Sequence, residues 1–405
     1  MRIAYAAFEA FPNRKGAGAR MRQMLGALAE AGHEVHLLTL PPRSPEPLPA
    51  GVVHHPLVAG ADNYLERALV FRSQVARRLR TLAPDVVHVR GVFEGEAAAA
   101  QADRTGCPFV FEVNGLPSVE LRYHYRAVGE AQAFEARLRA LEARLLGRAD
   151  RVITQSRTTL AFLHHRGLPR DTDARVIPNG ADPARWALPP APPSDRLRVL
   201  YAGTLAAWQG VAELLMAIRR VARERPVELR LAGHLARARR RQVERLLRRL
   251  KLSDGVALLG PLGPDALTAE VAAAHVCAAP LRRDLRNRVQ GCSPIKLYEY
   301  MAASRAIVST DLPCVREIVE PEVTARLIRA PQPKRLAAAL PALSAAPEQR
   351  ARLGEAARAE VIARATWAHR RQALVDLYAD FTAGTSPRPP TPPGPPPGPA
   401  VATRS

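Results

Sequence analysis

The chain has 405 residues, 47% of them hydrophobic, which is enough for two ordinary domains that each bury a core of their own. Its 59 basic and 38 acidic residues give a net charge of +21, but lysines are few and the arginines are spread along the whole chain. Few aromatic side chains accompany the basic stretches, so dedicated nucleic-acid binding is not expected. The predominance of arginine over lysine is typical of codon bias in a GC-rich genome, and attraction of a basic surface to anionic lipid is a more plausible role for this charge than nucleic-acid binding.

No segment approaches the roughly 18 apolar residues that a membrane-spanning helix requires. Glu9, Pro12 and Asn13 interrupt the opening segment before a signal-peptide core could form. We therefore expect a cytoplasmic protein, with peripheral contact at the inner face of the plasma membrane as an open option. The scattered cysteines form no CxxC pair, which favours free thiols over a zinc site or a disulfide framework: Cys107, Cys277, Cys292 and Cys314.

Short apolar runs alternate with helical patterns, which is typical of a parallel sheet covered on both faces. The first series of predicted strands lies at 2–7, 34–40, 84–89, 109–113 and 151–156, with a helix at 19–31. After the proline-rich stretch Pro189–Asp195, the pattern restarts with strands at 197–202, 227–233, 255–260, 275–280, 306–310 and 324–328. The sequence therefore predicts an α/β protein of two doubly wound domains, residues 1–188 and 189–365.

The end of the chain differs from the rest. Residues 366–382 are predicted to form a helix that crosses back to the first domain, because its apolar face needs a surface to cover. That face consists of Trp367, Leu374, Leu377, Tyr378 and Phe381. Residues 383–405 are rich in proline and offer no apolar surface to bury, which predicts a disordered or semi-rigid tail.

The segment Gly291–Ala302 holds the most informative pattern. Ser293 is a good N-cap and Pro294 suits the first helical position, so a helix is predicted to start here. Lys296 then adds positive charge to a helix terminus that is already positive, which is unfavourable unless an anion binds there. Glu299 lies one turn further along the same face, where its carboxylate can accept hydrogen bonds from sugar hydroxyls. These residues indicate a phosphate site beside a ribose site, and a surface ion pair between them is the alternative.

A glycine-containing turn follows the first strand of each predicted domain. Gly16–Gly18 lets the backbone approach a ligand at a helix N-terminus, although many such turns contain glycine and the signal alone is weak. In the second domain, Gly203, Thr204 and Gln209 are predicted to face the same cleft, at the carboxyl end of a strand. Trp208 beside them is interpreted as a packing residue rather than a stacking platform.

Nine segments, in this order, resemble the retaining glycosyltransferases of family four: GAGAR, LAEAGHEVHLLT, PDVVHVRG, FEVNGLP, ADRVITQS, VIPNGADPARW, YAGTLAAWQG, CSPIKLYEYMA and TWAHRRQALVDLY. The resemblance covers nearly the whole chain except the proline-rich tail. It implies the GT-B fold, in which two Rossmann-like domains face each other across a cleft. It also implies sugar transfer from a nucleoside diphosphate sugar with retention of configuration, without a metal ion or another cofactor. The acceptor stays open between a cell-envelope polysaccharide, a glycolipid and a small metabolite.

The resemblance gives roles to residues that match the family's motifs. Glu299 matches the glutamate that holds the donor ribose. Lys296 and Leu297 match the donor phosphate loop, which Ser293 opens. The first-domain loop that closes on the leaving diphosphate is matched by Gly16, Ala17 and Gly18.

Several departures from the family pattern each remove a charge or a proton carrier. Gly291 stands where many members have a first glutamate, and Asn114 where many have a histidine near the reacting centre. Thr204 and Gln209 stand where an arginine and a lysine commonly hold the diphosphate. The resemblance implies that the leaving diphosphate takes the acceptor proton, so its electrostatic stabilisation is the main task. We predict that Arg288 supplies a replacement charge, with a solvated arginine as the alternative.

First-domain residues predicted to line the acceptor or sugar side of the cleft are Glu112, Asn114, Gly115 and Glu120. Asn114 is counted as catalytic together with Lys296 and Glu299, because its amide can donate and accept hydrogen bonds with sugar hydroxyls. The alternative is that it caps the turn after its strand. The basic amphipathic helix Glu66–Arg80 is interpreted either as a surface for anionic membrane or as a solvated face.

The missing charges keep a second function open, an inactive protein of the same fold that binds a nucleotide sugar or a protein partner. A sugar-nucleotide epimerase and a basic nucleic-acid binder are less favoured. Asn179 and Asp182 are interpreted as turn residues near the hinge between the domains. The donor sugar, its base and the acceptor are not specified by these residues, because a fold does not determine its substrate.

Overall fold

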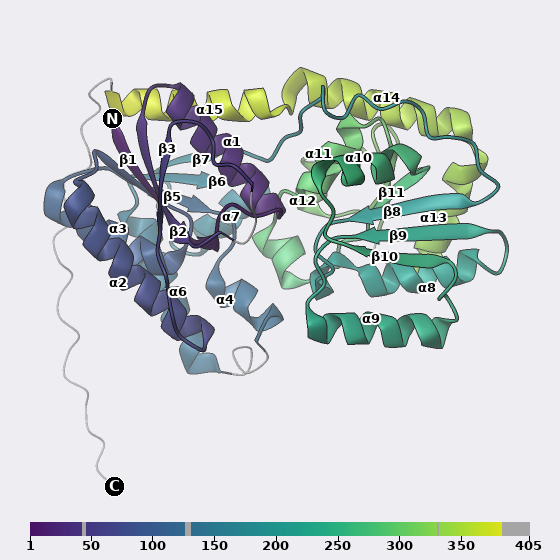
Figure 1. Cartoon of the computed structure of the whole chain (residues 1–405), viewed down its shortest axis with the longest axis horizontal. Helices are drawn as coiled ribbons and strands as arrows, with labels where there is room; N and C mark the ends of the chain where they lie inside the picture. The colour runs from purple at the N-terminus through teal and green to yellow at the C-terminus, as the bar shows by residue number, and fades with distance from the viewer. Residues whose placement is uncertain (43–45, 126–130, 330–331, 383–405) are drawn as a thin grey trace, which may run out of the picture.

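The computed structural model describes residues 1–42, 46–125, 131–329 and 332–382, which form two α/β halves side by side (Figure 1). Within these residues, the first half contains a seven-stranded parallel sheet of order β3-β2-β1-β4-β5-β6-β7. Its strands are β1 (Arg2–Ala10), β2 (Glu34–Leu40), β3 (Val52–Pro56), β4 (Val86–Val89), β5 (Phe109–Val113), β6 (Arg151–Thr154) and β7 (Asp173–Val176). Its helices are α1 (Gly16–Glu30), α2 (Tyr64–Leu82), α3 (Val92–Thr105), α4 (Pro117–Glu120), η1 (Leu121–Tyr123), α6 (Gln132–Arg148) and α7 (Arg157–His165).

The second half contains, within the described residues, a six-stranded parallel sheet of order β10-β9-β8-β11-β12-β13. Its strands are β8 (Leu197–Ala202), β9 (Val227–Ala232), β10 (Val256–Gly260), β11 (Val276–Ala279), β12 (Ala306–Thr310) and β13 (Arg326–Ile328). Its helices are η2 (Ala207–Gln209), α8 (Val211–Val221), α9 (Arg237–Leu250), α10 (Pro264–Ala273), η3 (Arg286–Gln290), α11 (Ile295–Ala302), α12 (Pro313–Arg316), α13 (Pro333–Ala345) and α14 (Pro347–Arg364).

Helices cover both faces of each sheet, because strands that are apolar on both sides need two covers. In the first half, α1 packs on one face and α2, α3 and α6 on the other. In the second half, α10, α11 and α14 cover one face and α8, α9 and α13 the other. The prediction of two doubly wound parallel sheets is confirmed.

The strand order changes direction at β1 in one sheet and at β8 in the other. The strand β1 pairs with β2 on one side and β4 on the other, and β8 likewise pairs with β9 and β11. Ligands of doubly wound sheets bind at such switch points, beyond the carboxyl ends of the strands. The predicted domain boundary at 188/189 falls between β7 and β8, in a segment without regular strands, and stays a prediction.

The last helix, α15 (Trp367–Thr382), crosses back from the second half to the first, as predicted (Figure 1). Trp367, Leu374, Leu377 and Tyr378 enter the core beneath β1. The hydroxyl of Tyr378 lies 2.8 Å from Nδ1 of the buried His88, which fixes the helix on the first sheet. The proline-rich tail lies outside the described residues.

Two helix starts differ from the prediction. α1 begins at Gly16 rather than Ala19, so the glycine turn is the first turn of the helix itself. α11 begins at Ile295 with Pro294 as its N-cap, one residue later than expected. The hydroxyl of Ser293 does not cap this helix because it accepts a hydrogen bond from the amide of Asn179 at 3.1 Å instead.

Candidate functional site

The first turns of α1 and α11 meet where the two halves of the molecule touch. A Cβ atom added at Gly16 would lie 3.0 Å from Cγ2 of Ile295, so a larger residue would push the turns apart. At Gly18 an added Cβ would lie 2.5 Å from the carbonyl oxygen of Asn13. Ala17, between the glycines, is partly exposed. Both helices therefore bring their positive ends to one place, which favours a bound anion.

Lys296 extends from α11 toward the loop after β8. Its ammonium donates to Oε1 of Gln209 at 2.9 Å and lies 3.8 Å from the centre of the Tyr201 ring. A Cβ atom added at Gly203 would lie 2.7 Å from Nζ, so a larger residue would displace this ammonium. Burial lowers the pKa of Lys296 to about 7, although Glu299 favours its charged form. The structure thus brings together Gly203, Gln209 and Lys296, as predicted for a shared site.

Glu299 follows Lys296 by one helical turn and is partly buried. Burial raises the pKa of its carboxyl to about 7, while Arg185 and Lys296 act in the opposite direction. Within the described residues, its carboxylate takes part in no hydrogen bond and no ion pair. Its oxygens are therefore free to accept hydrogen bonds from a ligand.

Two other residues predicted to bind the donor, Thr204 and Leu297, contribute a backbone group or core packing. The carbonyl of Thr204 accepts a hydrogen bond from the Tyr201 hydroxyl at 2.6 Å, which fixes the loop after β8. Leu297 is fully buried, and its amide donates to the carbonyl of Pro294 at 3.0 Å. The side chain of Leu297 is therefore part of the core, and only the backbone near it faces the site.

Two family models match the chain, one on each half. The model described as Glycosyltransferase Family 4 matches residues 14–185, and that described as Glycosyl transferases group 1 matches residues 196–345. The chain belongs to the family four glycosyltransferases. Its fold is GT-B, as the resemblance implied, with two doubly wound domains and a helix that crosses back.

Similarity to known proteins supports this assignment of the chain to the glycosyltransferases. A glycogen synthase of Mycobacterium tuberculosis is 26% identical over 279 residues, which are 61% of this chain and 66% of that protein. The structure of sucrose-phosphate synthase from Thermosynechococcus elongatus is 21% identical with a TM-score of 0.80, over 95% of this chain and 100% of that one. Anabaena HepE, solved with UDP-glucose, is 16% identical with a TM-score of 0.71, over 94% of this chain and 100% of that one. These structures share the fold.

Glu112 does not line the cleft of the glycosyltransferase, contrary to the prediction. It is 1% exposed and lies 2.7 Å from both Nε of Arg20 and the hydroxyl of Tyr5. Burial alone would raise its pKa, but Arg20 and Arg90 hold the pKa well below its usual range. Because the first domain supplies all these partners, Glu112 stabilises the sheet. Its neighbour Asn114 donates to it at 3.0 Å.

The amide oxygen of Asn114 is buried and, among the described residues, has no hydrogen-bond partner. A buried acceptor of this kind is costly unless water or a ligand satisfies it. The backbone carbonyl of Asn114 accepts from Gln155 at 2.8 Å, so the turn is fixed without the side-chain oxygen. This leaves the side chain available for a sugar hydroxyl, and its predicted catalytic role stays a prediction.

Glu120 and Gly115 lie at the contact between the domains rather than on an open wall. The carboxylate of Glu120 accepts from Nε2 of Gln290 at 2.8 Å and pairs with Arg286 at 3.0 Å. A Cβ added at Gly115 would lie 2.6 Å from the same carboxylate. Arg286 also lies 5.0 Å from the ring centre of Trp208, which is buried as the packing interpretation predicted.

Arg288 lies on η3, two residues after Arg286, and its side chain is exposed. Within the described residues this side chain makes no hydrogen bond or ion pair, and no contact links it to Lys296. Arg286 is the inward-pointing arginine of this segment. Its sequence context does not distinguish it from Arg282, Arg283 or Arg288, and its ion pair with Glu120 holds it at the contact between the domains.

Gly291 occupies a position where no side chain fits. Its φ is +82°, and an added Cβ would lie 2.9 Å from Oγ1 of Thr159 and 3.0 Å from Oγ of Ser156. The start of α7 in the first domain therefore fills the space that a first glutamate would need. The family departure at this position follows from contact between the domains.

The remaining predictions concern the hinge and the membrane. Asn179 donates from Nδ2 to the carbonyl of Ser293 at 2.5 Å, and Asp182 accepts from the amide of Ala184 at 2.9 Å, so both stabilise turns near the hinge.

The apolar face of α2 is buried in the first domain through Phe71, Val75 and Leu79. That face is therefore not available to insert into a membrane, and the choice between a membrane-facing and a solvated basic face stays a prediction.

Two further residues of the site were not predicted from the sequence. Tyr201 contacts both Lys296 and Gln209, whose Oε1 lies 3.1 Å from the tyrosine hydroxyl, and its place two residues before Gly203 was an available signal. Arg185 comes from the linker and lies close enough to affect the Glu299 carboxyl. In the described part of the chain, no helix is long and apolar enough to span a bilayer, and no cluster of His, Cys, Asp and Glu is placed to hold a metal ion.

Proposed function

We propose that this glycosyltransferase moves a sugar from a nucleoside diphosphate sugar to an acceptor, with retention of configuration and without a metal ion. The observation that carries the proposal is the pair Lys296 and Glu299 on α11. Lys296 is a buried cation whose ammonium contacts only the neutral amide of Gln209 and the ring of Tyr201. The carboxylate of Glu299 forms no hydrogen bond or ion pair with any described residue. A ligand with an anionic diphosphate beside a ribose would satisfy both groups.

Each residue then has a definite task. The ammonium of Lys296 and the first turn of α11 hold the diphosphate, and its negative charge keeps the lysine protonated. Glu299 accepts hydrogen bonds from the ribose hydroxyls. The turn Gly16–Gly18 covers the leaving diphosphate, which takes the proton of the acceptor hydroxyl as the new bond forms. Asn114 orients a hydroxyl of the transferred sugar.

A UDP-sugar is our choice of donor, supported by the fold shared with HepE, which was solved with UDP-glucose. The acceptor is a sugar, a lipid-linked sugar or a small metabolite. The second candidate function, donor binding without turnover, is favoured by the absence of room at Gly291 and by the use of Gln209 to hold Lys296.

Thermal unfolding of the protein with UDP, ADP, GDP and their glucose conjugates tests the donor site, since a specific ligand raises the midpoint by mass action. We expect UDP to stabilise the wild type and the controls Lys334→Met and Glu355→Gln, whose side chains are exposed. Lys296→Met and Glu299→Ala should show no shift. Release of UDP from UDP-glucose in the presence of acceptor sugars then separates the two functions, because binding without turnover selects the inactive one.

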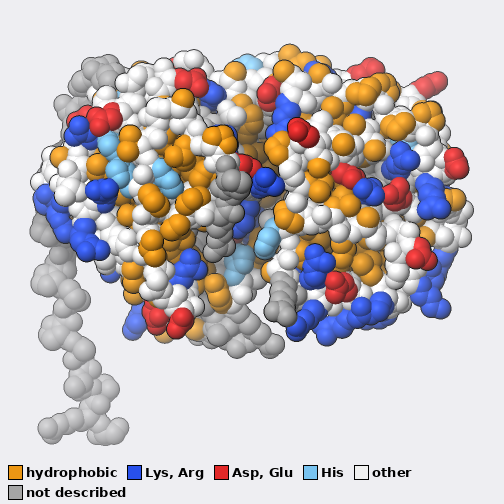
Figure 2. Space-filling model, in the orientation of Figure 1, with side chains coloured by type: hydrophobic (Ala, Val, Ile, Leu, Met, Phe, Trp, Pro, Cys, Tyr) orange, Lys and Arg blue, Asp and Glu red, His pale blue; other side chains and the backbone are white. Residues whose placement is uncertain are grey.

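We also propose a cytoplasmic, peripheral enzyme that touches anionic membrane through α9 rather than α2. Figure 2 shows blue side chains along the lower edge of the second domain, where α9 lies. The exposed arginines of this helix are Arg240, Arg241, Arg245, Arg248 and Arg249. Co-sedimentation with phosphatidylglycerol vesicles should be lost in 0.5 M salt, because the Debye length falls to about 4 Å and the surface attraction is screened. Equal binding to neutral phosphatidylcholine vesicles would contradict the proposal.

A further inference from the structure

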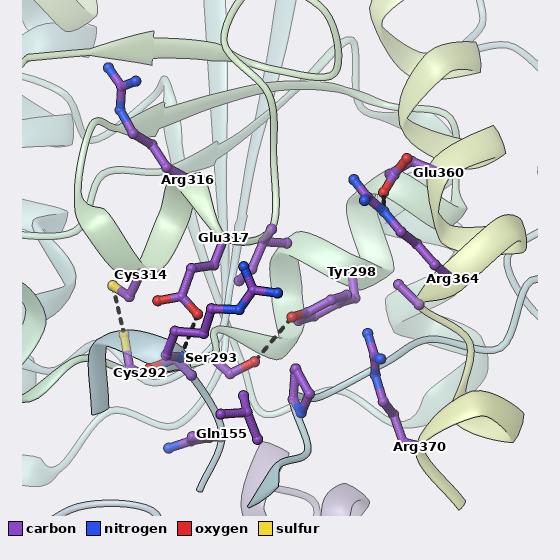
Figure 3. Close-up of a pocket in the computed structure, with 16 residues that line it drawn as sticks. Gln155, Cys292, Ser293, Tyr298, Cys314, Arg316, Glu317, Glu360, Arg364 and Arg370 are labelled. Atoms are coloured by element: carbon purple, nitrogen blue, oxygen red, sulfur yellow. Dashed lines mark hydrogen bonds and ion pairs between the residues drawn. The ribbon is translucent and has the colours of Figure 1, made fainter. Parts of the chain in front are cut away.

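A second pocket lies behind α11, at the hinge between the domains (Figure 3). Its volume is about 440 Å³, within the range of small-molecule sites. The lining residues are, from the first domain, Gln155–Arg157, Val176 and Pro178; from the second, Cys292, Ser293, Tyr298, Cys314 and Arg316–Ile318; and from the crossing of α14 to α15, Glu360, Arg364, Ala365 and Arg370. Three separate parts of the chain therefore close around one space.

This pocket is separate from the proposed donor site. Lys296 and Glu299 share one face of α11, whereas Tyr298 points into the hinge pocket (Figure 3). The hydroxyl of Tyr298 lies 3.2 Å from Oγ of Ser293, at the floor of the pocket. The helix α11 thus stands between the two sites and is a wall of both.

Arginines dominate the pocket lining, and two of them are already paired. Arg316 donates to Asp311 at 2.5 and 2.9 Å, and Arg364 pairs with Glu360. The remaining acid, Glu317, is occupied as well. Its carboxylate accepts from the amides of Arg157 and Thr158 at 2.6 and 2.8 Å, where it caps the start of α7. No acid of the lining is left to balance the other two arginines.

The other two arginines of the pocket lining are Arg157 and Arg370. In the part of the chain that the structure describes, neither forms an ion pair with a carboxylate. Arg370 donates only from Nε, to the carbonyl of Asn179 at 3.1 Å. Burial lowers the pKa of Arg370, and the nearby Arg20 and Arg364 lower it further. The outer nitrogens of its guanidinium are therefore donors in a positive environment without an anion.

We propose that the hinge pocket binds a small phosphate-bearing anion, held by Arg370 and Arg157 and by the hydroxyl of Tyr298. Guanidinium groups bind phosphate through paired, charge-assisted hydrogen bonds. The three contacts come from α15, the first domain and α11, so the ligand joins the parts that must move if the domains open. Inorganic phosphate occupies the anion position alone, and the pocket has room for the organic part of a phosphomonoester.

The test uses Lys296→Met as the starting protein, so that phosphate cannot bind at the donor site. Inorganic phosphate and glycerol 3-phosphate are titrated at constant ionic strength, with sodium chloride in place of the ligand as the blank. The variants added to this background are Arg157→Met, Arg370→Met and, as a matched control, Arg248→Met, an exposed arginine of α9.

We expect saturable binding by calorimetry, weakened at least tenfold by Arg157→Met or Arg370→Met and unchanged by Arg248→Met. Tighter binding of glycerol 3-phosphate than of inorganic phosphate identifies a phosphomonoester as the ligand, and the reverse identifies free phosphate. If Arg370→Met does not fold, Arg157→Met decides alone, because its side chain is exposed. No binding to the Lys296→Met protein, or binding that Arg157→Met leaves unchanged, overturns the proposal. The donor assays with UDP are independent of either result.

Discussion

Two glutamates, the buried Glu112 in the first domain and the partly buried Glu299 in the second, have opposite environments. Glu112 lies within hydrogen-bond distance of Arg20, Tyr5 and Asn114, and its pKa is held well below its usual range. Glu299 bonds to no described residue, and burial raises its pKa to about 7. Both follow the same rule that a buried charge needs partners.

The contrast indicates that the cluster around Glu112 is structural and that the pair Lys296 and Glu299 is a binding site for a ligand. The first domain supplies all the hydrogen-bond and charge partners of Glu112, so this carboxylate is not free to bind a substrate. The second domain leaves Glu299 and Lys296 incomplete, at a cost in stability that a bound nucleotide sugar would offset. Incomplete burial of charge is thus the physical signature of the donor site, and each substitution below tests it.

The largest effect on stability is expected for Glu112→Gln. The substitution leaves Arg20 buried without a counter-charge and leaves Arg90 with only Glu9 at 3.6 Å, which costs about 3–5 kcal/mol. A loss of this size should lower the midpoint of thermal unfolding by about 10 °C or more for a domain of this size. Glu299→Gln, the matched change in the second domain, should leave the midpoint at pH 7 unchanged or raise it. Equal losses in the two variants would contradict the comparison.

Lys296→Met should lower the rate of sugar transfer by about 10²–10³-fold, the typical effect of removing one electrostatic contact to a transition state. Its stability should not fall. The pKa of Lys296 is lowered from 10.5 to about 7, so the folded protein disfavours the charged form at neutral pH. The contribution of the lysine to stability is therefore least below pH 7 and recovers as the pH rises toward 10.5. Unfolding midpoints of the variant and wild type at pH 6 and pH 9 measure this.

Much of this architecture follows from sequence patterns. Apolar strands, helical spacing and glycine turns predict both sheets and the return of α15, because each of these signals is local. Lys296 and Glu299 could be chosen for the same reason, since a lysine in a first helical turn is unfavourable without an anion.

The errors concern contacts between distant segments. Glu112 was placed in the cleft because its strand ends there, but alternation along β5 sends its side chain to Arg20 inside the domain. Arg288 was chosen over Arg286 because the π-helical turn of η3 is not visible in the sequence. Room at Gly291 depends on α7, which is far away in the sequence.

The pH dependence of stability should have opposite signs for the two glutamates. The pKa of Glu299 is raised in the folded protein, so its contribution is present below about 4.5 and is lost as the pH rises through about 7. The pKa of Glu112 is lowered, so its contribution is present above about 4.5 and is lost in acid. The midpoint of wild type relative to Glu299→Gln should therefore fall between pH 4.5 and 8, by an amount reduced by the partial exposure of Glu299. The gap between wild type and Glu112→Gln should close in acid. Slopes of the same sign would count against the assignment of the two environments.

A loss of stability smaller than that of Glu112→Gln is expected at Gly291, where contact between the domains replaces the family's first glutamate. Gly291→Ala places a Cβ against Thr159 and Ser156 in a left-handed backbone, so it combines strain with a clash. Gly106→Ala is the control for a Cβ added at positive φ without a clash, because Gly106 has a φ of +74° and a ψ of 5° with nothing within 4 Å of the added Cβ. Gly291 has a ψ of 171°, a region that only glycine readily adopts, so its backbone strain is the greater of the two. Backbone strain alone costs about 1 kcal/mol, so the control should lose that much and Gly291→Ala distinctly more. Denaturant titration of both variants measures the difference. If the two losses are equal, α7 yields easily at this contact, and the domains can separate far enough to admit the glutamate that the family carries there.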